Sequence, residues 1–328
     1  MGATSRVTLA DVARAAGVDV SLVSRVLRGH DVKVLDETRQ RIVDQARELG
    51  YRPNAIARSL RSSKAGAFGL VIPNFSNPVY AQIIAGAESA AARNGSVMMT
   101  TSGEGWDRAE WYAALDSGRV DGLLVAGGSP VELRNLRVPY LLVNRSEPGI
   151  DRFVVLDDEK AAGEAVRHLL ELGHRDLAFV GGPEDADTAR RRWAGFEAAV
   201  AAQPGATAVQ LPGDYTAAGG RAAVADAVRR GLRVTGVVAG NLPSGIGVLE
   251  GLRDVGVPVP HEASVVAIHD AEIAEYVLPR LTTVRMPLRE LGARGIELLT
   301  TLAPDEPVAE VVADPIGLVL RDSTGPVA

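Results

Sequence analysis

The sequence contains no cysteine, few aromatic residues and no long hydrophobic run. With no cysteine among 328 residues, a disulfide framework, a thiol nucleophile and a cysteine metal site are excluded. Aromatic residues make up 4% and hydrophobic residues 46%, so we expect a core of alanine, valine and leucine. No apolar stretch approaches the roughly 20 residues of a membrane span, and no signal peptide is evident. These absences predict a soluble, cytoplasmic protein without membrane contact.

The charge is distributed unevenly along the chain, whose net charge is −6. Residues 1–64 contain 12 Lys and Arg against 7 Asp and Glu, a net +5, whereas residues 65–328 contain 23 against 34, a net −11. A basic segment on an acidic body suggests that the segment meets a polyanion and the body does not. The length suits a small domain followed by one or two larger ones.

Residues 9–27 have the pattern of two short helices joined at a glycine, with apolar residues at helical spacing. Thr8 and Asp11 resemble a capping box, Gly17 can end the first helix, and Asp19 can cap the second. The outer face of the second helix carries small, polar and basic groups able to reach bases and phosphates: Val20, Ser21, Ser24 and Arg25. Taken alone, this stretch could also be an ordinary helical hairpin in a core.

Residues 36–50 predict a third helix, which Gly50 ends and whose inner stripe is Ile42, Val43, Ala46 and Leu49. Three helices of this size can close a small core. Pro53 then begins a segment of about two turns, residues 54–60, which is too short to persist alone in water. A linker of small residues follows at 62–66, so this marginal helix between two domains could order only when bound.

From Phe68 onward, short apolar runs alternate with helical stretches. Phe68–Pro73 is typical of a buried parallel strand, and further strands are expected at 96–99, 122–126, 140–143, 177–180, 208–210, 236–239 and 264–268. Helices are expected between them at 79–94, 108–117, 161–172, 189–202, 217–230 and 244–255. This alternation predicts parallel sheets with right-handed crossovers. The units are too many for one sheet, so we expect two α/β lobes that divide near residues 156–158.

Several short motifs follow one another in a fixed order along nearly the whole chain. After the helical pair come Thr38-Arg39, Gly50-Tyr51-Arg52-Pro53-Asn54, Ala57-Arg58-Ser59-Leu60, Asn77-Pro78, Val120-Asp121-Gly122-Leu123, Leu172-Gly173-His174-Arg175, Ala194-Gly195-Phe196 and Leu281-Thr282-Thr283-Val284. In order and spacing the sequence resembles the lac repressor and purine repressor (LacI) family of bacterial transcription regulators.

The resemblance implies an α/β protein with three parts. Residues 1–50 would form a three-helix, helix-turn-helix DNA-binding head, and residues 51–66 a hinge helix and linker. Residues 67–328 would form a ligand-binding core of two lobes, similar to periplasmic sugar-binding proteins. Its N-lobe would comprise about 67–156 plus 286–316, and its C-lobe about 157–285 plus 317–328.

By the resemblance, the helix that begins near Asp19 enters the major groove of a near-palindromic, double-stranded operator. Val20 can contact a thymine methyl, Ser21 can donate or accept a hydrogen bond, and Arg25 can bind guanine in bidentate fashion. Thr8 and Ser24 match positions that contact phosphates in this family, and such contacts set the register of the protein on the DNA. The hinge residues implied to contact DNA are Asn54, Ala57, Arg58 and Leu60.

In this family the hinge leucine, here Leu60, wedges into a central base step from the minor groove. The alternative is a leucine that docks the linker on the core. Two residues depart from the family pattern beside the DNA. Asp19 and Leu35 stand where serines are usual, so Asp19 must turn away from phosphates or accept from a cytosine amino group.

The cleft between the lobes is the implied site of a small-molecule effector, at the carboxyl ends of the strands. Tyr80 and Tyr215 offer aromatic faces, Arg192 can bind two oxygens, and Asp270 can accept from a hydroxyl. This chemistry suits a polyhydroxylated ligand, a sugar or a nucleoside. The other implied site residues are Asn74, Phe75, Asn144, Arg145, Asn241 and His269.

Three residues of this site depart from the family pattern. Asn144 stands where Asp is frequent, Leu242 replaces an Asp that commonly follows Asn241, and His269 occupies a position where an aromatic residue is usual. The polarity around the ligand is therefore altered, and the ligand is not identified by analogy.

The sequence does not indicate an enzyme. His269–Asp270 resembles half a catalytic triad but lacks the accompanying G-x-S-x-G elbow. The glycine pairs at 127–128 and 181–182 lack a nucleotide-binding pattern. We expect no catalytic residue, no metal and no cofactor.

The expected function is a transcriptional repressor of a catabolic operon whose operator affinity depends on the effector, with induction and corepression both open. The alternative is a solute-binding protein without a DNA role, which predicts a signal sequence and no basic head. The lack of a leucine heptad near the C-terminal end favours a homodimer over a tetramer.

Overall fold

A computed structural model describes residues 7–27, 32–51, 64–102, 108–127, 133, 135–313 and 315–327, except for the side chains of residues 108, 109 and 112. The chain forms two compact units, Met1–Lys64 and Ala65–Ala328. Within the described residues, no helix is both long enough and apolar enough to cross a membrane.

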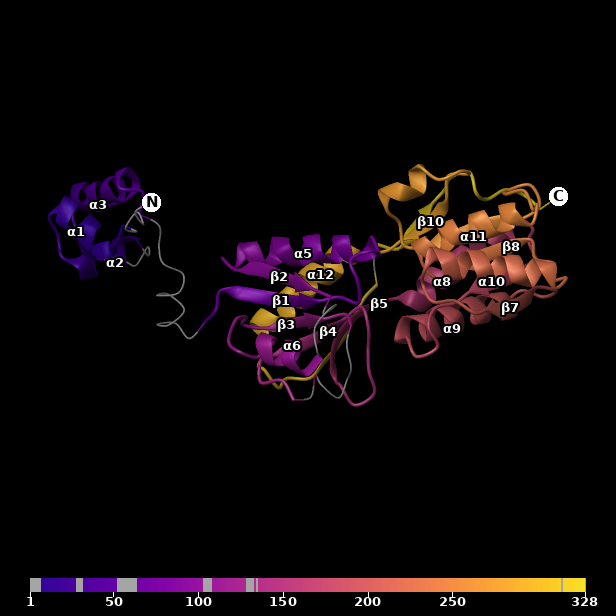
Figure 1. Ribbon diagram of the computed structural model, residues 1–328, viewed down its shortest axis with the longest axis horizontal. Helices are drawn as coiled ribbons and strands as arrows, with labels where there is room; N and C mark the ends of the chain where they lie inside the picture. Colours follow the sequence, from indigo (N-terminus) through magenta and orange to yellow (C-terminus); the bar gives the residue numbers. More distant parts are fainter. Residues whose placement is uncertain are drawn as a thin grey trace. The chain divides into compact units, whose positions relative to one another are not determined.

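The described part of the first unit contains helices α1 (Leu9–Ala16), α2 (Val20–Leu27) and α3 (Asp36–Glu48) (Figure 1). Gly17 ends α1 with a left-handed φ of 64°, as predicted. The buried residues of this small core are Val12, Ala13, Ala16, Val23, Val26, Ile42 and Ala46. Leu49 was expected in this core but is exposed, because α3 ends at Glu48, before it.

The second unit contains two six-stranded sheets, one in each lobe. The sheet of the N-lobe is entirely parallel, in the order β11-β5-β4-β3-β1-β2. Its strands are β1 (Ala67–Val71), β2 (Val97–Thr101), β3 (Leu123–Val125), β4 (Tyr140–Val143), β5 (Arg152–Leu156) and β11 (Val308–Val312). Helices α5 (Val79–Arg93) and α12 (Leu288–Thr301) pack together over one face, and α6 (Arg108–Leu115) covers the other (Figure 1).

The sheet of the C-lobe has the order β12-β10-β9-β8-β6-β7, in which only the short strand β12 is antiparallel to its neighbour. The strands are β6 (Asp176–Val180), β7 (Thr207–Leu211), β8 (Gly236–Ala239), β9 (Ser264–Ile268), β10 (Thr282–Arg285) and β12 (Gly317–Val319). Its faces are covered by α8 (Asp158–Glu171) with α9 (Asp187–Ala201), and by α10 (Ala217–Arg229) with α11 (Leu242–Asp254). A short 3₁₀ helix, η1 (Glu272–Glu275), follows β9.

The chain passes between the two sheets after β5, after β10 and after β11. Each lobe is therefore built from segments that are distant in sequence, and the prediction of two α/β lobes is confirmed. One hydrophobic cluster continues from the α5 and α12 side of the N-lobe to the α8 and α9 side of the C-lobe.

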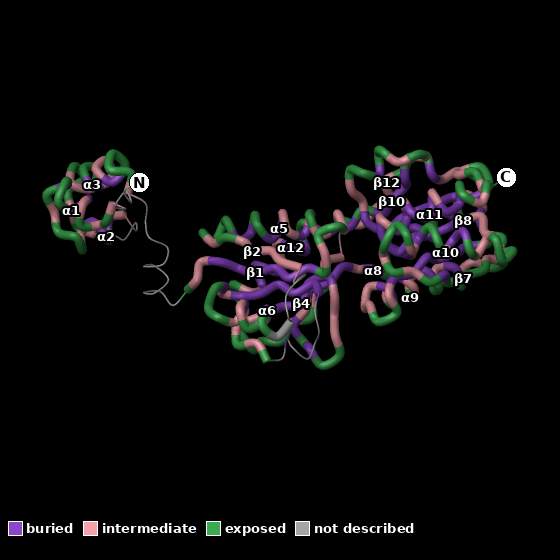
Figure 2. The backbone as a smooth tube through the Cα atoms, in the orientation of Figure 1, coloured by how far each residue is buried: buried purple, intermediate pink, exposed green. Residues whose placement is uncertain are grey.

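Central strands are buried on both faces, whereas edge strands are partly exposed (Figure 2). In β1 and β9 every residue is buried, as expected of parallel strands covered by helices on both sides. A rigid sheet fixes the loops that follow such strands, and the candidate site combines residues of these loops with residues of the neighbouring helices.

Candidate functional site

Arg192 is a buried residue of α9, with 2% of its side chain exposed, and it contacts three other segments of the C-lobe. Its Nε donates to Oδ1 of Asp158 at 2.7 Å, and its Nη1 donates to the carbonyl of Gly240 at 2.6 Å. Its Nη2 lies 3.1 Å from Nε2 of His269. Burial disfavours the charged guanidinium, but Asp158, together with Tyr215 and Tyr80, outweighs this effect, and the pKa of Arg192 is raised.

The contact with Arg192 fixes the state of the His269 ring. A guanidinium can only donate hydrogen bonds, so Nε2 accepts and Nδ1 carries the proton. Burial, and then the charge of Arg192, hold the pKa of His269 well below its usual range, so the ring is neutral. Nδ1 is buried and has no hydrogen-bond partner within the described chain. Because an unpaired buried N–H is costly, an oxygen atom bound there would be stabilised.

Tyr215 lies beside Arg192, with the guanidinium carbon 5.5 Å from the ring centroid. Its hydroxyl is 3.1 Å from Oγ1 of Thr188. The ring packs so closely on Gly182 that a Cβ at that position would come within 2.3 Å of it. Burial raises the pKa of Tyr215, so its phenol stays neutral. A glycine at 182 is therefore required for this placement of the aromatic ring.

Tyr80, on α5 of the N-lobe, is close enough to Arg192 and Tyr215 for these residues to affect its pKa. Burial raises the pKa of Tyr80 to about 12, and the charges of Arg192 and Arg145 and the phenol of Tyr215 also act on it. The structure therefore brings a tyrosine of the N-lobe close to the arginine and tyrosine of the C-lobe.

Asn241 positions Tyr215 instead of lying free beside a ligand. Its Nδ2 donates to the main-chain carbonyl of Tyr215 at 2.9 Å. Its Oδ1 accepts from the backbone N–H of Ser244 at 2.9 Å and so caps α11.

Left-handed backbone at non-glycine residues is concentrated among the expected effector residues. Within the described chain it occurs at Asn144 (φ 60°), Tyr215 (φ 65°) and His269 (φ 72°). Such conformations are strained and persist where surrounding structure holds them, often at functional sites. Oδ1 of Asn144 is also buried and has no hydrogen-bond partner within the described residues.

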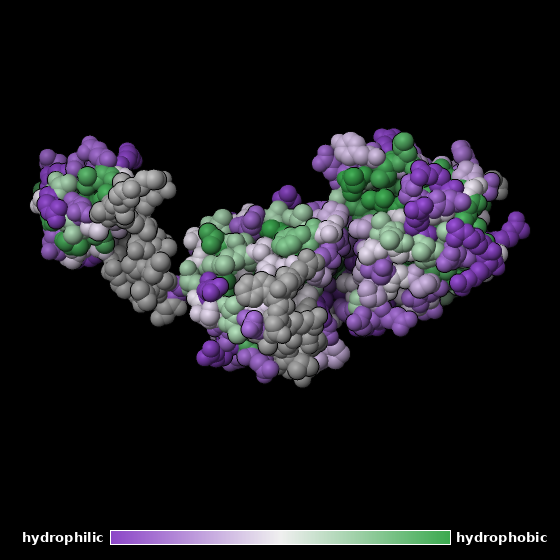
Figure 3. Space-filling model, in the orientation of Figure 1, coloured by the Kyte–Doolittle hydropathy of each residue, from purple (hydrophilic) through white to green (hydrophobic). Residues whose placement is uncertain are grey.

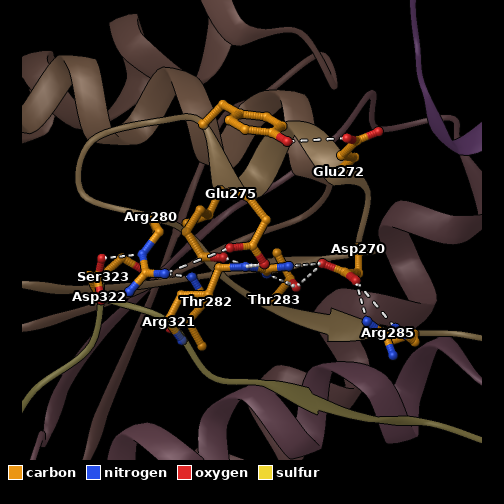
Figure 4. A network of polar contacts seen from close by, with 12 residues as sticks. Asp270, Glu272, Glu275, Arg280, Thr282, Thr283, Arg285, Arg321, Asp322 and Ser323 are labelled. Carbon is orange, nitrogen blue, oxygen red and sulfur yellow. Dashed lines mark hydrogen bonds and ion pairs between the residues drawn. The ribbon is translucent and has the colours of Figure 1, made fainter.

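Asp270 belongs to a different network, shown in Figure 4. Its Oδ1 accepts from Thr283 Oγ1 at 2.7 Å and from Arg321 Nη2 at 2.8 Å, and its Oδ2 accepts from Arg285 Nη2 at 2.8 Å. Arg321 also binds Glu275. The expectation that Asp270 offers its carboxylate to a ligand is therefore corrected, because β10 and the segment after β12 place protein donors against both oxygens.

Three other residues expected to bind the effector have different surroundings. Oδ1 of Asn74 accepts from the backbone N–H groups of Ser76 and Asn77, which forms a local turn. Phe75 is exposed. Arg145 pairs with Glu147, and both side chains are largely buried.

Two residues that sequence patterns did not indicate complete the site. Asp158, in the first turn of α8, is the partner of Arg192, and Thr188 on α9 is the partner of Tyr215. The signal available for Asp158 is its place directly after the apolar strand β5, where polar residues of such folds face the ligand.

Polar contacts join the lobes near these residues. Nε2 of Gln82 on α5 donates to the main-chain carbonyl of Asp270 at 2.7 Å. The backbone N–H of Ser146 donates to Oδ2 of Asp187, at the start of α9, at 3.0 Å. Because these contacts lie at the boundary of the lobes, a change in lobe closure would alter them.

The outer face of α2 has the polar and basic character expected from the sequence, with one exception. Val20, Ser21 and Arg25 are exposed, and Nε of Arg25 lies 3.4 Å from the carbonyl of Ser21. Ser24 is buried, so its expected place on the exposed face is wrong.

Thr8 and Asp19 both cap helices. The backbone N–H of Thr8 donates to Oδ2 of Asp11 at 2.9 Å, and the backbone N–H of Asp11 donates to the hydroxyl oxygen of Thr8 at 3.4 Å, which completes the predicted capping box of α1. Oδ1 of Asp19 accepts from the backbone N–H of Ser21 at 2.7 Å. The expected hinge contacts, Asn54, Ala57, Arg58 and Leu60, lie outside the described residues.

Comparison with known proteins gives matches to both units. The profile of bacterial regulatory proteins of the lacI family matches residues 8–54, and that of the periplasmic binding protein-like domain matches residues 166–324. Catabolite control protein A of Priestia megaterium is 31% identical over 330 residues, which cover 97% of this chain and 99% of that protein.

Solved structures match over nearly the full length. The lac repressor dimer bound to operator and the anti-inducer ONPF has a TM-score of 0.83 at 26% identity, and the match covers 98% of this chain and 100% of that chain. The complex of the transcriptional regulator CelR with cellobiose has a TM-score of 0.71 at 29% identity, and the match covers 97% of this chain and 100% of that chain.

Proposed function

The chain belongs to the lacI family of bacterial regulatory proteins and is a DNA-binding regulator of transcription, and we propose that it represses a catabolic operon. In this proposal it acts in the cytoplasm, as a homodimer on a near-palindromic operator. A small polyhydroxylated effector, a sugar or a nucleoside, binds between the lobes and changes operator affinity. The alternative of a solute-binding protein without a DNA role is not supported, because the family profile covers the helical pair.

The observation that carries the effector proposal is the arrangement of donors around Arg192. A guanidinium has five N–H groups, and three hydrogen bonds hold this one against Asp158, Gly240 and His269. The remaining N–H groups and the Nδ1–H of His269 are suited to hydroxyl or carbonyl oxygens. Tyr80 and Tyr215 supply aromatic faces for a ring.

The charges favour an uncharged ligand. Asp158 and Asp187 together balance Arg191 and Arg192, and Glu147 balances Arg145. Each of these charged side chains is already paired with one of opposite charge, so these pairs offer no uncompensated charge to a cation or an anion. The cellobiose in the CelR complex is a neutral carbohydrate held by a structurally similar protein, which supports the same ligand class here.

A thermal-shift screen of sugars and nucleosides tests the effector proposal. We expect one class to raise the melting temperature of the wild-type protein and to have little effect on Arg192→Lys, which keeps the charge but loses the planar set of donors. Arg190→Lys, on the exposed side of the same helix, is the matched control and should respond like wild type. An equal response of Arg192→Lys would contradict the proposal.

The homodimer proposal is supported by exposed apolar residues on both lobes. The edge strand β2 exposes Val97 and Met99, and the segment around η1 exposes Ile273, Tyr276 and Leu278. Figure 3 shows hydrophobic residues at the C-lobe surface near β10. Exposed apolar edges of this kind mark association surfaces. Light scattering should give a dimer for wild type and a monomer for Met99→Glu combined with Leu278→Glu; an unchanged dimer would place the interface elsewhere.

For DNA binding we propose the division into a head (1–50), a hinge (51–66) and a core (67–328). Val20, Ser21 and Arg25 contact base edges from α2, and Leu60 wedges into the central base step. Leu60→Ala should weaken binding to the operator far more than binding to random duplex, as measured by fluorescence anisotropy. An equal loss on both duplexes would remove the wedge and favour docking of the linker on the core.

A further inference from the structure

The described helices of the first unit all begin with carboxylates. Asp11 closes the capping box of α1, Asp19 caps α2, and Asp36 and Glu37 lie in the first turn of α3. Within the described residues, each helix of this unit has an acidic side chain either in its first turn, as in α1 and α3, or at the capping position just before it, as in α2, although residues 1–64 are basic overall. This arrangement is unexpected in a unit that binds a polyanion.

Asp19 is the most consequential of these residues because it lies at the start of the helix whose outer face meets the bases. Its Oδ1 accepts from the Ser21 N–H at 2.7 Å, and its main-chain carbonyl accepts from the N–H groups of Leu22 and Val23. The hydrogen bonds from Ser21, and more weakly the charge of Arg25, hold the pKa of Asp19 below its usual range. Asp19 is exposed and ionised at neutral pH.

The start of a helix ordinarily attracts phosphate. The unpaired N–H groups and the helix dipole amount to about half a positive charge there, and DNA-binding helices use such ends to hold the backbone. In α2 the carboxylate of Asp19 occupies the Ser21 N–H and adds a full negative charge at the same end. A phosphate at this end would lose that donor and be repelled.

We propose that Asp19 is a specificity-determining residue that keeps backbone phosphate away from the start of α2, so that this helix binds DNA only where base contacts are favourable. The proposal rests on the proposed function, in which α2 enters the major groove. It predicts that the wild-type head makes fewer phosphate contacts than its positive charge suggests. Its binding to random DNA is correspondingly weak, and Arg25 on the same face contributes more of the discrimination between sequences.

The test uses full-length wild type, Asp19→Asn and Asp19→Ser. Binding to a random duplex and to a duplex selected in vitro by the wild-type protein is measured by anisotropy over a range of salt concentrations. Asn and Ser cap helices about as well as Asp, so thermal melts should show that the variants fold. Asp44→Asn is the matched control, because it removes the same charge from the outer side of α3.

For both Asp19 variants we expect random-duplex affinity to rise about tenfold at low salt. The slope of log K against log salt should steepen by about 0.9 for each head that gains a phosphate contact. Affinity for the selected duplex should rise less, so the ratio of specific to random binding falls. Asp44→Asn should leave the slope unchanged.

Unchanged slopes for the Asp19 variants, or the same steepening for Asp44→Asn, would overturn the proposal. A changed base preference at one position with an unchanged slope would also overturn it, and would assign Asp19 to direct contact with a cytosine amino group. If wild type binds neither duplex at low salt, the proposed function fails instead.

Discussion

Arg192 donates to Nε2 of His269 over 3.1 Å, and this contact leaves the only ring proton of His269 on the buried atom Nδ1. The two residues come from α9 and from the end of β9, so the sheet and the helix covering it fix the relationship. His269 is thereby a neutral hydrogen-bond donor toward any ligand bound between the lobes. A carboxylate at this place would accept instead, so the identity of residue 269 determines which ligand atoms are favoured.

Removing the guanidinium should destabilise the core. Arg192→Ala removes the partner bonded to Oδ1 of Asp158, whose carboxylate is completely buried, and leaves it only the ion pair of its Oδ2 with Arg191. We expect the free energy of unfolding to fall by about 3–5 kcal/mol, measured by urea denaturation. Arg190→Ala, whose side chain is exposed and lies 3.9 Å from Asp187, should change it by less than about 0.5 kcal/mol. A decrease in the free energy of unfolding of less than about 1 kcal/mol for Arg192→Ala would contradict this prediction, because it would show that other groups stabilise the Asp158 carboxylate.

Gly182→Ala should displace Tyr215, since the added Cβ would lie within 2.3 Å of its ring. We expect a destabilisation of about 1–3 kcal/mol by urea denaturation and a weaker effector-induced thermal shift. Gly163→Ala is the control, because nothing lies within 4 Å of its Cβ in α8, and it should stabilise by up to about 1 kcal/mol. A normal effector shift in Gly182→Ala would mean that Tyr215 does not contact the ligand.

The buried histidines predict a loss of stability on acidification. Burial lowers the pKa of both His174 and His269 in the folded chain, while the unfolded chain has ordinary values near 6.5. The unfolded state therefore binds more protons as the pH falls through about 6.5, and the free energy of unfolding decreases below that pH. Each ring contributes a slope of up to about 1.4 kcal/mol per pH unit.

Urea midpoints measured from about pH 7.5 to about pH 5.5 check this prediction. His269→Gln should shallow the slope by the contribution of one ring, because glutamine does not titrate but can still accept from Arg192. A slope unaffected by His269→Gln would mean that this ring binds protons equally in the folded and the unfolded chain, and would contradict the prediction.

Asp270→Asn should affect stability more than ligand binding. The carboxylate holds Arg285 and Arg321, and the side chain of Arg321 is 5% exposed. We expect a loss of about 2 kcal/mol or more in urea denaturation. Effector affinity, measured by calorimetry, should change little at a temperature where the variant is folded. The opposite result, normal stability with lost binding, would restore Asp270 as a ligand residue.

Much of the fold follows from local sequence patterns. The predicted ranges 236–239 and 264–268 are those of β8 and β9, because central parallel strands are uninterrupted apolar runs. Helix α12 gives no such signal, since Gly292 and Gly295 interrupt it. These glycines are explained by tertiary packing: a Cβ at Gly292 would come within 2.0 Å of the Ile83 carbonyl on α5.

Strand β5 also depends on tertiary contacts. It begins with a buried arginine, Arg152, which donates to the carbonyls of Tyr140 and Ala303. A charged residue at that position argues against a buried strand when the sequence is considered alone. Only the fold shows that distant carbonyls satisfy it.

The candidate site was only partly predictable for the same reason. Arg192, Tyr215 and His269 lie where the motif positions indicate, after strands or facing their ends. The partner of Arg192 is Asp158, which lies 34 positions away in sequence, and no local pattern connects them. The two adjacent residues His269 and Asp270 serve different networks, because successive side chains after a strand point in different directions.

In this proposal the Arg192 cluster binds an effector, and this binding changes the affinity of the protein for DNA. The most direct test measures operator affinity by anisotropy with and without the effector found in the thermal-shift screen, for wild type and Arg192→Lys. We expect the effector to change operator affinity at least about tenfold for wild type and not at all for Arg192→Lys, and the two proteins to have equal operator affinity without effector. An undiminished response in Arg192→Lys would contradict it.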